Sequence, residues 1–315
     1  MISVIIPLYN KAASVAYTLD SVIRQTEHDF ELIIVNDGST DDSVLVVEQW
    51  INSIHEKGTD ISVRLVNQPN SGVSSARNRG AQEAAGEYFA FLDADDIWDE
   101  NYLAEQKRMI KAYPEAAMWA TAFAIQNGDG VIDVPYDIKG YEGYIDNYLS
   151  LGHRSNIFFV CVCVVRRSAF DAVGGYDTRI AIGEDLDFSF RVALRHKMAC
   201  NLAYCGLYYR QDAENRAMAG KRKPLDKCLA YYIEKFEEDM QRNASFAEFF
   251  GKYVAGYLEP YYFEAKDIMC TKPLQYLPYD QLPFYMRWQY KMPFMWGRLI
   301  HGLFKLLRII YGKIN

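Results

Sequence analysis

The chain opens with short apolar runs that alternate with longer segments of helical spacing. Runs of this length that are rich in β-branched residues are typical of buried parallel strands, whereas apolar residues three and four positions apart predict helices. The pattern predicts strands at 3–8, 31–35, 62–67 and 89–92, and helices at 12–25 and 73–85. Strands and helices that alternate in this way favour a parallel sheet with helices on both faces.

Beyond the fourth strand the pattern becomes mainly helical. A helix is expected to begin near Ile97, and residues 188–194 are typical of another. From Pro224 onward the strand pattern stops, and residues 225–240 and 246–262 combine helical spacing with many aromatic side chains. The sequence therefore predicts an α/β part followed by a helical extension.

The fourth predicted strand ends in a cluster of acids. Residues 89–96 are Phe-Ala-Phe-Leu-Asp-Ala-Asp-Asp, so Asp93 and Asp95 directly follow an apolar run. Carboxylates this close repel each other, and a divalent cation that prefers oxygen ligands removes the conflict. Ligands of open α/β folds bind at the carboxyl edge of the sheet, so the cluster predicts a metal site there. An acidic turn that caps the helix near Ile97 is the alternative.

Composition and charge restrict the class of protein. The chain of 315 residues is 50% apolar, and its net charge of −7 argues against a general nucleic-acid binder. The six cysteines show neither a disulfide framework nor metal-type spacing, which favours a reducing cytosol. We expect neither a signal peptide nor a membrane span, because a basic leader and a long uncharged stretch are both missing. The phosphate loops GxGxxG and GxxxxGK(S/T) are also missing, which leaves the acidic cluster to hold phosphates through a metal.

Five short motifs follow one another in order. They are Val-Ile-Ile-Pro-Leu-Tyr-Asn at 4–10, Val-Asn-Asp-Gly-Ser-Thr-Asp at 35–41, Asn-Ser-Gly at 70–72 with Ala-Arg-Asn-Arg-Gly at 76–80, Leu-Asp-Ala-Asp-Asp at 92–96, and Gly-Glu-Asp-Leu-Asp-Phe at 183–188. In this order the motifs resemble the inverting family-2 glycosyltransferases of the GT-A fold. The resemblance fades after about residue 216.

The resemblance implies a Rossmann-like, mixed and mainly parallel sheet flanked by helices, with a C-terminal helical extension. A GT-A catalytic domain is expected at 1–222, with a nucleotide-binding half at about 1–97 and an acceptor half at about 98–222. The helical extension is expected at 223–315.

The same resemblance implies roles in binding the nucleotide. Pro7 and Tyr9 would line the base pocket, with the Tyr9 ring stacked on uracil, and Asp37 would accept the uracil N3–H. Arg77 lies in the segment that closes over the base, and Asn10 is a further nucleotide-binding candidate. Each has a plainer interpretation: Tyr9 as a strand-edge aromatic, Asp37 as a helix cap, Arg77 as a solvated charge and Asn10 as a structural residue.

The metal site rests on the resemblance as well. Asp95 would ligate Mg²⁺ or Mn²⁺, and Asp93 would bind the ribose or support the metal. Family members often have a histidine after a Tyr-Arg pair, but here Tyr209 and Arg210 are followed by Gln211 and Asp212. Asp212 could serve as a carboxylate ligand in place of that histidine, or Arg210 could hold the phosphates alone.

A third group of acids supplies the candidate base. Glu184, Asp185 and Asp187 precede the helix expected at 188–194, and one of them is expected to be a simple cap with a favourable helix-dipole interaction. By resemblance, Asp185 is the base that takes the proton of the acceptor hydroxyl, and Glu184 contacts the donor sugar or the acceptor. One direct displacement would then invert the anomeric centre.

The C-terminal tail differs in charge from the rest. Residues 281–315 contain six Lys or Arg and no acid, and Arg298, His301, Lys305 and Arg308 fall on one helix face. Such a basic amphipathic helix predicts peripheral contact with the inner face of the cell membrane, although a helix docked on the protein is the alternative.

The leading hypothesis is a metal-dependent inverting glycosyltransferase. It would move a sugar from a nucleotide-sugar, most simply a UDP-sugar, to a saccharide or lipid-linked saccharide in cell-surface polysaccharide synthesis. The alternatives are another nucleotide-sugar enzyme, such as a nucleotidyltransferase, and a non-catalytic saccharide-binding protein.

Overall fold

The computed structural model describes residues 1–128, 130–134, 136, 138–145, 157–180, 183–214 and 228–258. These residues belong to two compact units, one containing the described residues up to 214 and the other containing 228–258. The basic tail predicted at 281–315 lies outside the described residues. The expected domain limits, and the two halves of the catalytic domain, stay predictions.

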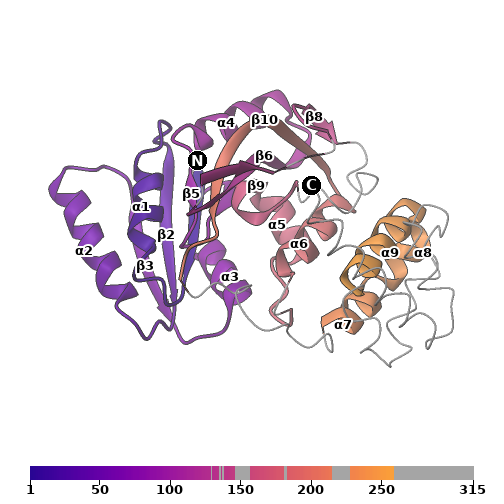
Figure 1. Ribbon diagram of the computed structural model, residues 1–315, viewed down its shortest axis with the longest axis horizontal. Coiled ribbons are helices and arrows are strands. Elements are labelled where there is room, and N and C mark those ends of the chain that lie inside the picture. The colour runs from indigo at the N-terminus through magenta and orange to yellow at the C-terminus, as the bar shows by residue number, and fades with distance from the viewer. Residues whose placement is uncertain are drawn as a thin grey trace, which may run out of the picture. The chain divides into compact units, whose positions relative to one another are not determined.

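The first four strands alternate with three helices. In chain order the elements are β1 (Ile2–Leu8), α1 (Val15–Ile23), β2 (Phe30–Asp37), α2 (Ser43–Glu56), β3 (Val63–Gln68), α3 (Val73–Glu83) and β4 (Tyr88–Phe91). The strands are parallel and lie in the order β3-β2-β1-β4, so the chain reverses direction across the sheet after β3. Right-handed crossovers then place α1 and α2 on one face and α3 on the other, as Figure 1 shows.

The reversal makes the carboxyl ends of β1 and β4 the expected place for a ligand, because strand order switches between them. Every residue of β1 is buried, including Pro7. The backbone of Ile5 faces β4, because its carbonyl accepts a hydrogen bond from Leu92 N. Backbone polar groups of a strand point to the same neighbour at every second residue, so the backbone nitrogen of Pro7 also faces the β4 side. Because β4 has ended at that level, the missing N–H of Pro7 costs the sheet no hydrogen bond.

The second half of the sheet is mixed. Its elements are β5 (Ile97–Trp98), α4 (Tyr102–Ala112), β6 (Ala116–Asn127), β7 (Gly130–Asp133), β8 (Glu142–Ile145), the 3₁₀ turn η2 (Val160–Val162), β9 (Cys163–Arg166), α5 (Arg167–Val173), α6 (Glu184–Ala193) and β10 (Lys197–Arg210). The order continues from β4 as β9-β6-β10-β5, with β9 antiparallel to its neighbours and β10 parallel to β6. The predicted fold class, a mixed and mainly parallel sheet flanked by helices, is confirmed.

One predicted helix start is wrong. Residues 97–98 form β5, which pairs with Leu207 and Tyr208 of β10, and the helix begins only at Tyr102. The indole of Trp98 is buried and donates to the Cys161 carbonyl at 2.7 Å, so tertiary contacts fix this segment as a strand. Helix α6 begins at Glu184, which places the acids predicted before the helix in its first turn.

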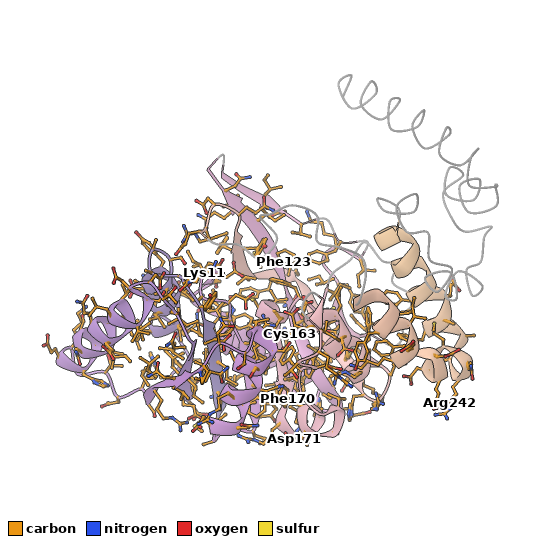
Figure 2. The ribbon with its side chains drawn as sticks, turned by 90° about the horizontal axis from the view of Figure 1, so that it is seen from below. Lys11, Phe123, Cys163, Phe170, Asp171 and Arg242 are labelled. Atoms are coloured by element: carbon orange, nitrogen blue, oxygen red, sulfur yellow. The ribbon has the colours of Figure 1, made fainter. Side chains whose placement is uncertain are left out.

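An aromatic cluster connects the end of β4 to the start of α6. Phe91 packs edge-on against Tyr176 with ring centroids 5.2 Å apart, and Tyr176 stacks on Phe188 of α6 at 4.6 Å. The ring centroid of Phe170 on α5 lies 5.8 Å from that of Phe91 and 5.4 Å from that of Phe188. Figure 2 shows Phe170 among densely packed side chains. Aromatic contacts of this kind fix the distance between the two acid clusters.

Helix α3 approaches the sheet closely. A Cβ on Gly80 would lie 2.3 Å from Cγ2 of Ile5, so only glycine allows this helix to pack directly on β1. The close contact brings Arg77, one turn earlier on α3, under the carboxyl end of β4.

Glu31 is a buried carboxylate on β2 that the sequence did not reveal. It accepts hydrogen bonds from Ser3 Oγ at 2.7 Å, Arg64 Nη2 at 2.6 Å and Ala85 N at 2.6 Å. Burial on its own raises the pKa of Glu31, but the hydrogen bonds from Ser3 and Ala85, together with Arg64, bring it below its ordinary value. The residue therefore stabilises the sheet as an ionised group.

The second unit contains α7 (Cys228–Lys235), α8 (Glu237–Arg242) and α9 (Ala244–Leu258). The helix expected at 225–240 is thus divided in two. The core of this second unit contains Phe236, Phe246 and Phe250, with ring centroids 5.4–5.5 Å apart. Within the described part of the chain, no helix combines the length and apolar character needed to cross a membrane.

Candidate active site

The loop after β1 carries two neighbouring residues with different roles, Tyr9 and Asn10. Tyr9 is 46% exposed, so its ring is available for stacking. Asn10 has a positive φ of 52°, a conformation that asparagine adopts more readily than most residues. Its Oδ1 accepts from Thr40 N at 2.8 Å and its N–H donates to Ser39 Oγ at 3.1 Å. Asn10 therefore joins the loops after β1 and β2, which favours the structural interpretation.

Asp37, at the end of β2, is 3% exposed and shapes the neighbouring turn. Its Oδ1 accepts from Ser71 N at 2.8 Å and from Gln68 Nε2 at 2.7 Å, and its Oδ2 accepts from Gly72 N at 2.9 Å. Each carboxylate oxygen can accept more than one bond, so a base contact stays a prediction. What the structure adds is that Asp37 holds the turn at 70–72.

The acids after β4 point to different partners. Asp93 accepts from Arg77 Nη2 at 2.7 Å, whereas Asp95 accepts from Lys11 Nζ at 2.6 Å. Burial raises the pKa of Asp95, the charge of Asp93 raises it further, and Lys11 opposes both. The two acids expected at the metal thus each have a protein cation beside them, and Lys11 was not predicted.

Asp96 is fully buried, and sequence analysis gave it no role. Its Oδ1 accepts from Arg210 N at 3.1 Å, which attaches the end of β10 to the acid cluster. Burial, with the charges of Asp93 and Asp95, raises the pKa of Asp96 well above that of an ordinary carboxyl. Among the described residues, one set of three ligand-type atoms lies within 4.8 Å of one another, from Asp93, Asp96 and Cys161.

Arg77 bridges the two acid clusters. The side chain is 2% exposed, and its second nitrogen, Nη1, donates to Glu184 Oε1 at 2.9 Å. Burial alone would lower the pKa of Arg77, but Asp93 and Glu184 raise it well above its ordinary value, so the guanidinium is charged. The guanidinium also lies 5.2 Å from the centroid of the Tyr176 ring. This location contradicts a solvated charge and places Arg77 between acids.

Glu184 and Asp185 differ in their partners. Asp185 Oδ1 accepts from Leu186 N at 2.9 Å, in the first turn of α6, which starts after Gly183 in a left-handed conformation with φ of 83°. Burial, reinforced by the charge of Glu184 and opposed by Arg77, raises the pKa of Asp185 to about 6. Asp187 is buried and bound to Arg191 at 2.5 Å, so it is the structural acid of the three.

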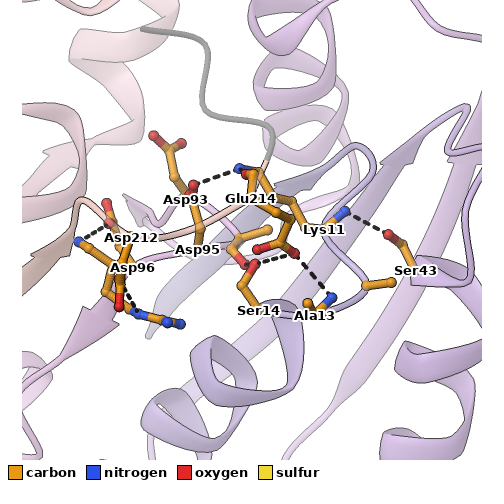
Figure 3. Close-up of polar contacts among 12 residues, drawn as sticks. Lys11, Ala13, Ser14, Ser43, Asp93, Asp95, Asp96, Asp212 and Glu214 are labelled. Carbon is orange, nitrogen blue, oxygen red and sulfur yellow. Dashed lines mark hydrogen bonds and ion pairs between the residues drawn. The ribbon is translucent and has the colours of Figure 1, made fainter. Parts of the chain in front are cut away.

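Beyond β10, two more acids return to the site. Asp212 Oδ1 lies 3.5 Å from Arg210 Nε and the side chain is 49% exposed. Glu214 O accepts from Lys11 Nζ at 2.6 Å, and Glu214 Oε1 accepts from Ser14 Oγ at 3.0 Å, as Figure 3 shows. Glu214 gave no signal in the sequence. Of the three predicted metal ligands, Asp93 belongs to the three-atom set with Asp96 and Cys161, whereas Asp95 and Asp212 do not.

The chain matches the family model described as glycosyl transferase family 2 over residues 3–174. It is 28% identical to the uncharacterized glycosyltransferase EpsJ of Bacillus subtilis, over 73% of this chain and 66% of EpsJ. It is also 28% identical to the uncharacterized glycosyltransferase alr2836 of Nostoc, over 96% of this chain and 88% of that protein. The chain thus spans slightly less than two thirds of EpsJ, and of the Escherichia coli relative YibD it spans 26%.

Two solved structures have a similar fold. Staphylococcus aureus TarS 1–349, in complex with UDP-GlcNAc, has a TM-score of 0.70 at 18% identity, over 95% of this chain and 88% of TarS. The mannosyltransferase PcManGT of Pyrobaculum calidifontis, in complex with GDP-Man and Mn²⁺, has a TM-score of 0.54 at 17% identity, over 98% of this chain and 75% of PcManGT.

Proposed function

The chain belongs to glycosyl transferase family 2 and has the GT-A fold, and from this premise we propose that it is a metal-dependent, inverting enzyme that uses a UDP-sugar. The acceptor would be a saccharide or lipid-linked saccharide in cell-surface polysaccharide synthesis. The observation that carries the proposal is the Arg77 bridge, because it holds the acid after β4 and the start of α6 in one charged network.

The donor would bind at the carboxyl ends of β1, β2 and β4. The exposed Tyr9 ring is suited to stack on a base, next to the turn that Asp37 holds. TarS was solved with UDP and with UDP-GlcNAc, which favours uracil, whereas PcManGT was solved with GDP-Man. The choice of UDP therefore rests on the fold of TarS and on the arrangement of Tyr9 and Asp37.

A divalent cation fits the acids that follow β4. Asp93 and Asp95 offer the hard oxygen ligands that Mg²⁺ and Mn²⁺ prefer, and burial together with the charge of Asp93 raises the pKa of Asp95. We propose these two as the residues that would hold the cation, with Asp212 as a third candidate. When bound, such a cation supplies positive charge for the leaving diphosphate.

Asp185 would accept the proton of the acceptor hydroxyl. As the hydroxyl oxygen forms its bond to the anomeric carbon, the bond from that carbon to the diphosphate oxygen breaks, and the proton passes to Asp185. Its pKa of about 6 leaves it ionised at neutral pH and more basic than an ordinary carboxylate. Attack from the face opposite the diphosphate inverts the configuration.

The decisive experiment measures UDP release from a panel of UDP-sugars with Mn²⁺, with and without saccharide acceptors. Asp185→Asn should keep UDP binding and lose transfer by about 10²-fold or more, whereas Asp95→Asn should lose both transfer and acceptor-independent hydrolysis. The exposed Asp171→Asn, on α5, is the matched control and should behave as the parent. Equal transfer by Asp185→Asn and the parent would exclude Asp185 as the base.

Membrane contact through 281–315 is a separate part of the proposal and lies outside the described residues. Truncation after Asp280 should abolish sedimentation with vesicles that contain anionic lipid, because juxtamembrane Lys and Arg each contribute about 1 kcal/mol near such a surface. Equal sedimentation of the truncated and full-length chains would reject the membrane anchor.

A further inference from the structure

Lys11 connects Asp95 to the segment that follows β10. Its Nζ donates to Asp95 Oδ2 and to the Glu214 carbonyl, both at 2.6 Å. The Lys11 side chain is 12% exposed and that of Asp95 is 16% exposed, so the pair lies largely out of water. The backbone N–H of Lys11 donates to Ser43 Oγ at 2.7 Å, which fixes the base of the side chain. The ammonium therefore has a defined position in the site (Figure 3).

The same segment is attached a second time, through the Glu214 side chain. Glu214 Oε1 accepts from Ala13 N and from Ser14 Oγ, both at 3.0 Å. These two donors lie just before α1, two and three residues after Lys11. We call the set of contacts among Lys11, Asp95, Ala13, Ser14 and Glu214 the Lys11 clasp.

We propose that Lys11 is a positioning residue that acts as the internal counter-cation of Asp95. In this role it sets the affinity of the site for a divalent cation, and it links cation binding to the position of residues 211–214. The inference rests on the proposed metal-dependent function and adds residues to which sequence analysis gave no role.

The physical reason is a competition between two cations for one carboxylate. A divalent ion held by Asp95 would share this carboxylate with the Lys11 ammonium, which donates to Asp95 Oδ2 at 2.6 Å. The two positive charges repel strongly in a site with this little water. Binding of the ion therefore displaces Lys11, and Lys11 then loses its contact with the Glu214 carbonyl as well.

The first test measures the affinity of the protein for Mn²⁺ in the absence of nucleotide, with electron paramagnetic resonance to quantify the free ion. Lys11→Met removes the competing charge and should tighten Mn²⁺ binding by about tenfold, because a charge-assisted hydrogen bond no longer has to be broken. Lys11→Gln should tighten it in the same direction, and Lys11→Arg should stay within about twofold of the parent. Lys57→Met is the matched control, because Lys57 is exposed at the end of α2.

The second test is hydrogen exchange at the Ala13 amide, which reports the clasp directly because this N–H donates to Glu214. In the parent chain, Mn²⁺ should raise the exchange rate of this amide several-fold. In Lys11→Met the rate should be high without Mn²⁺ and should not respond to it. A purely structural lysine would not make this exchange depend on the ion.

Two results overturn the inference and leave the proposed function intact. One is an unchanged Mn²⁺ affinity in both Lys11→Met and Lys11→Gln. The other is an exchange rate at the Ala13 amide that does not change when the parent chain binds Mn²⁺. If the parent binds no Mn²⁺ and Asp95→Asn transfers sugar at the parental rate, the metal premise fails, and the inference fails with it. Tighter binding in both neutral variants, together with Mn²⁺-dependent exchange at Ala13, supports the inference.

Discussion

The Arg77 bridge allows a quantitative prediction, the effect of Arg77→Met on the free energy of unfolding. Removal of one partner from a fully buried ion pair costs about 3–5 kcal/mol. Arg77 is 2% exposed and Glu184 13%, but Asp93 is 30% exposed and can regain water once Arg77 is gone. The lost cation–π contact with Tyr176 adds about 0.5–1 kcal/mol. We therefore predict a loss of about 3 kcal/mol.

Equilibrium unfolding in urea measures this loss, and the same helix supplies the control. Arg79 is 47% exposed and pairs with Glu83 four residues on, an arrangement that contributes about 0.3–0.5 kcal/mol. Arg79→Met should therefore lower the free energy of unfolding by no more than about 0.5 kcal/mol. If Arg77→Met is equally mild, the buried bridge does not stabilise the fold and the reasoning is wrong.

A double-mutant cycle then tests whether the bridge acts through Glu184. In Arg77→Met the Glu184 carboxylate is left without its cation, so the further change Glu184→Gln should restore about 1 kcal/mol. In the parent background the same change should be destabilising, because it breaks an ion pair. Strictly additive effects would show that the two side chains do not interact.

Three further predictions concern single residues. The rate of sugar transfer should fall as the pH drops below about 6, because the proposed base Asp185 accepts a proton only when ionised, and burial with the Glu184 charge raises its pKa to about 6; in a kcat–pH profile, Glu184→Gln should move this acid limb to lower pH. Asn10→Ala should unfold more easily than Asn10→Gly by about 1 kcal/mol in urea, because alanine is strained at a φ of 52°. Glu31 has a lowered pKa in the folded state, so it stabilises the fold above its unfolded pKa of about 4.3 and loses this effect as pH falls; Glu31→Gln should flatten the acid side of a stability–pH curve.

The first half of the fold could be predicted from the sequence because its strands are continuous apolar runs. The strands expected at 3–8 and 89–92 are Ile2–Leu8 and Tyr88–Phe91 in the structure, each displaced by one residue at most. Runs of this kind are recognised locally, since burial on both faces requires apolar residues at every position. The two-residue strand at Ile97 escaped prediction because its pairing with β10 involves residues about 110 positions away.

The acids of the site could be predicted, but their partners could not. Asp93, Asp95 and Asp185 stand out because carboxylates follow or precede apolar segments. Their network depends on pairs that are distant in sequence: Arg77 with Glu184 is 107 residues apart, and Lys11 with Glu214 is 203 residues apart. No local pattern encodes such contacts. The sequence therefore predicts Arg77 beside the uracil ring rather than between two acids, and it predicts no role for Lys11.

The distribution of cations also bears on which acid of α6 is the base. Glu184 forms an ion pair with the buried guanidinium of Arg77, so its carboxylate is already engaged with a protein partner. Asp185 has no ion pair among its described contacts, and burial together with the charge of Glu184 raises its pKa to about 6. Glu184 thus occupies Arg77 through an ion pair, while the charge of Arg77 still acts on Asp185 and limits how far the pKa of Asp185 rises. The arrangement therefore favours Asp185 as the base and Glu184 as the residue that holds Arg77 in place.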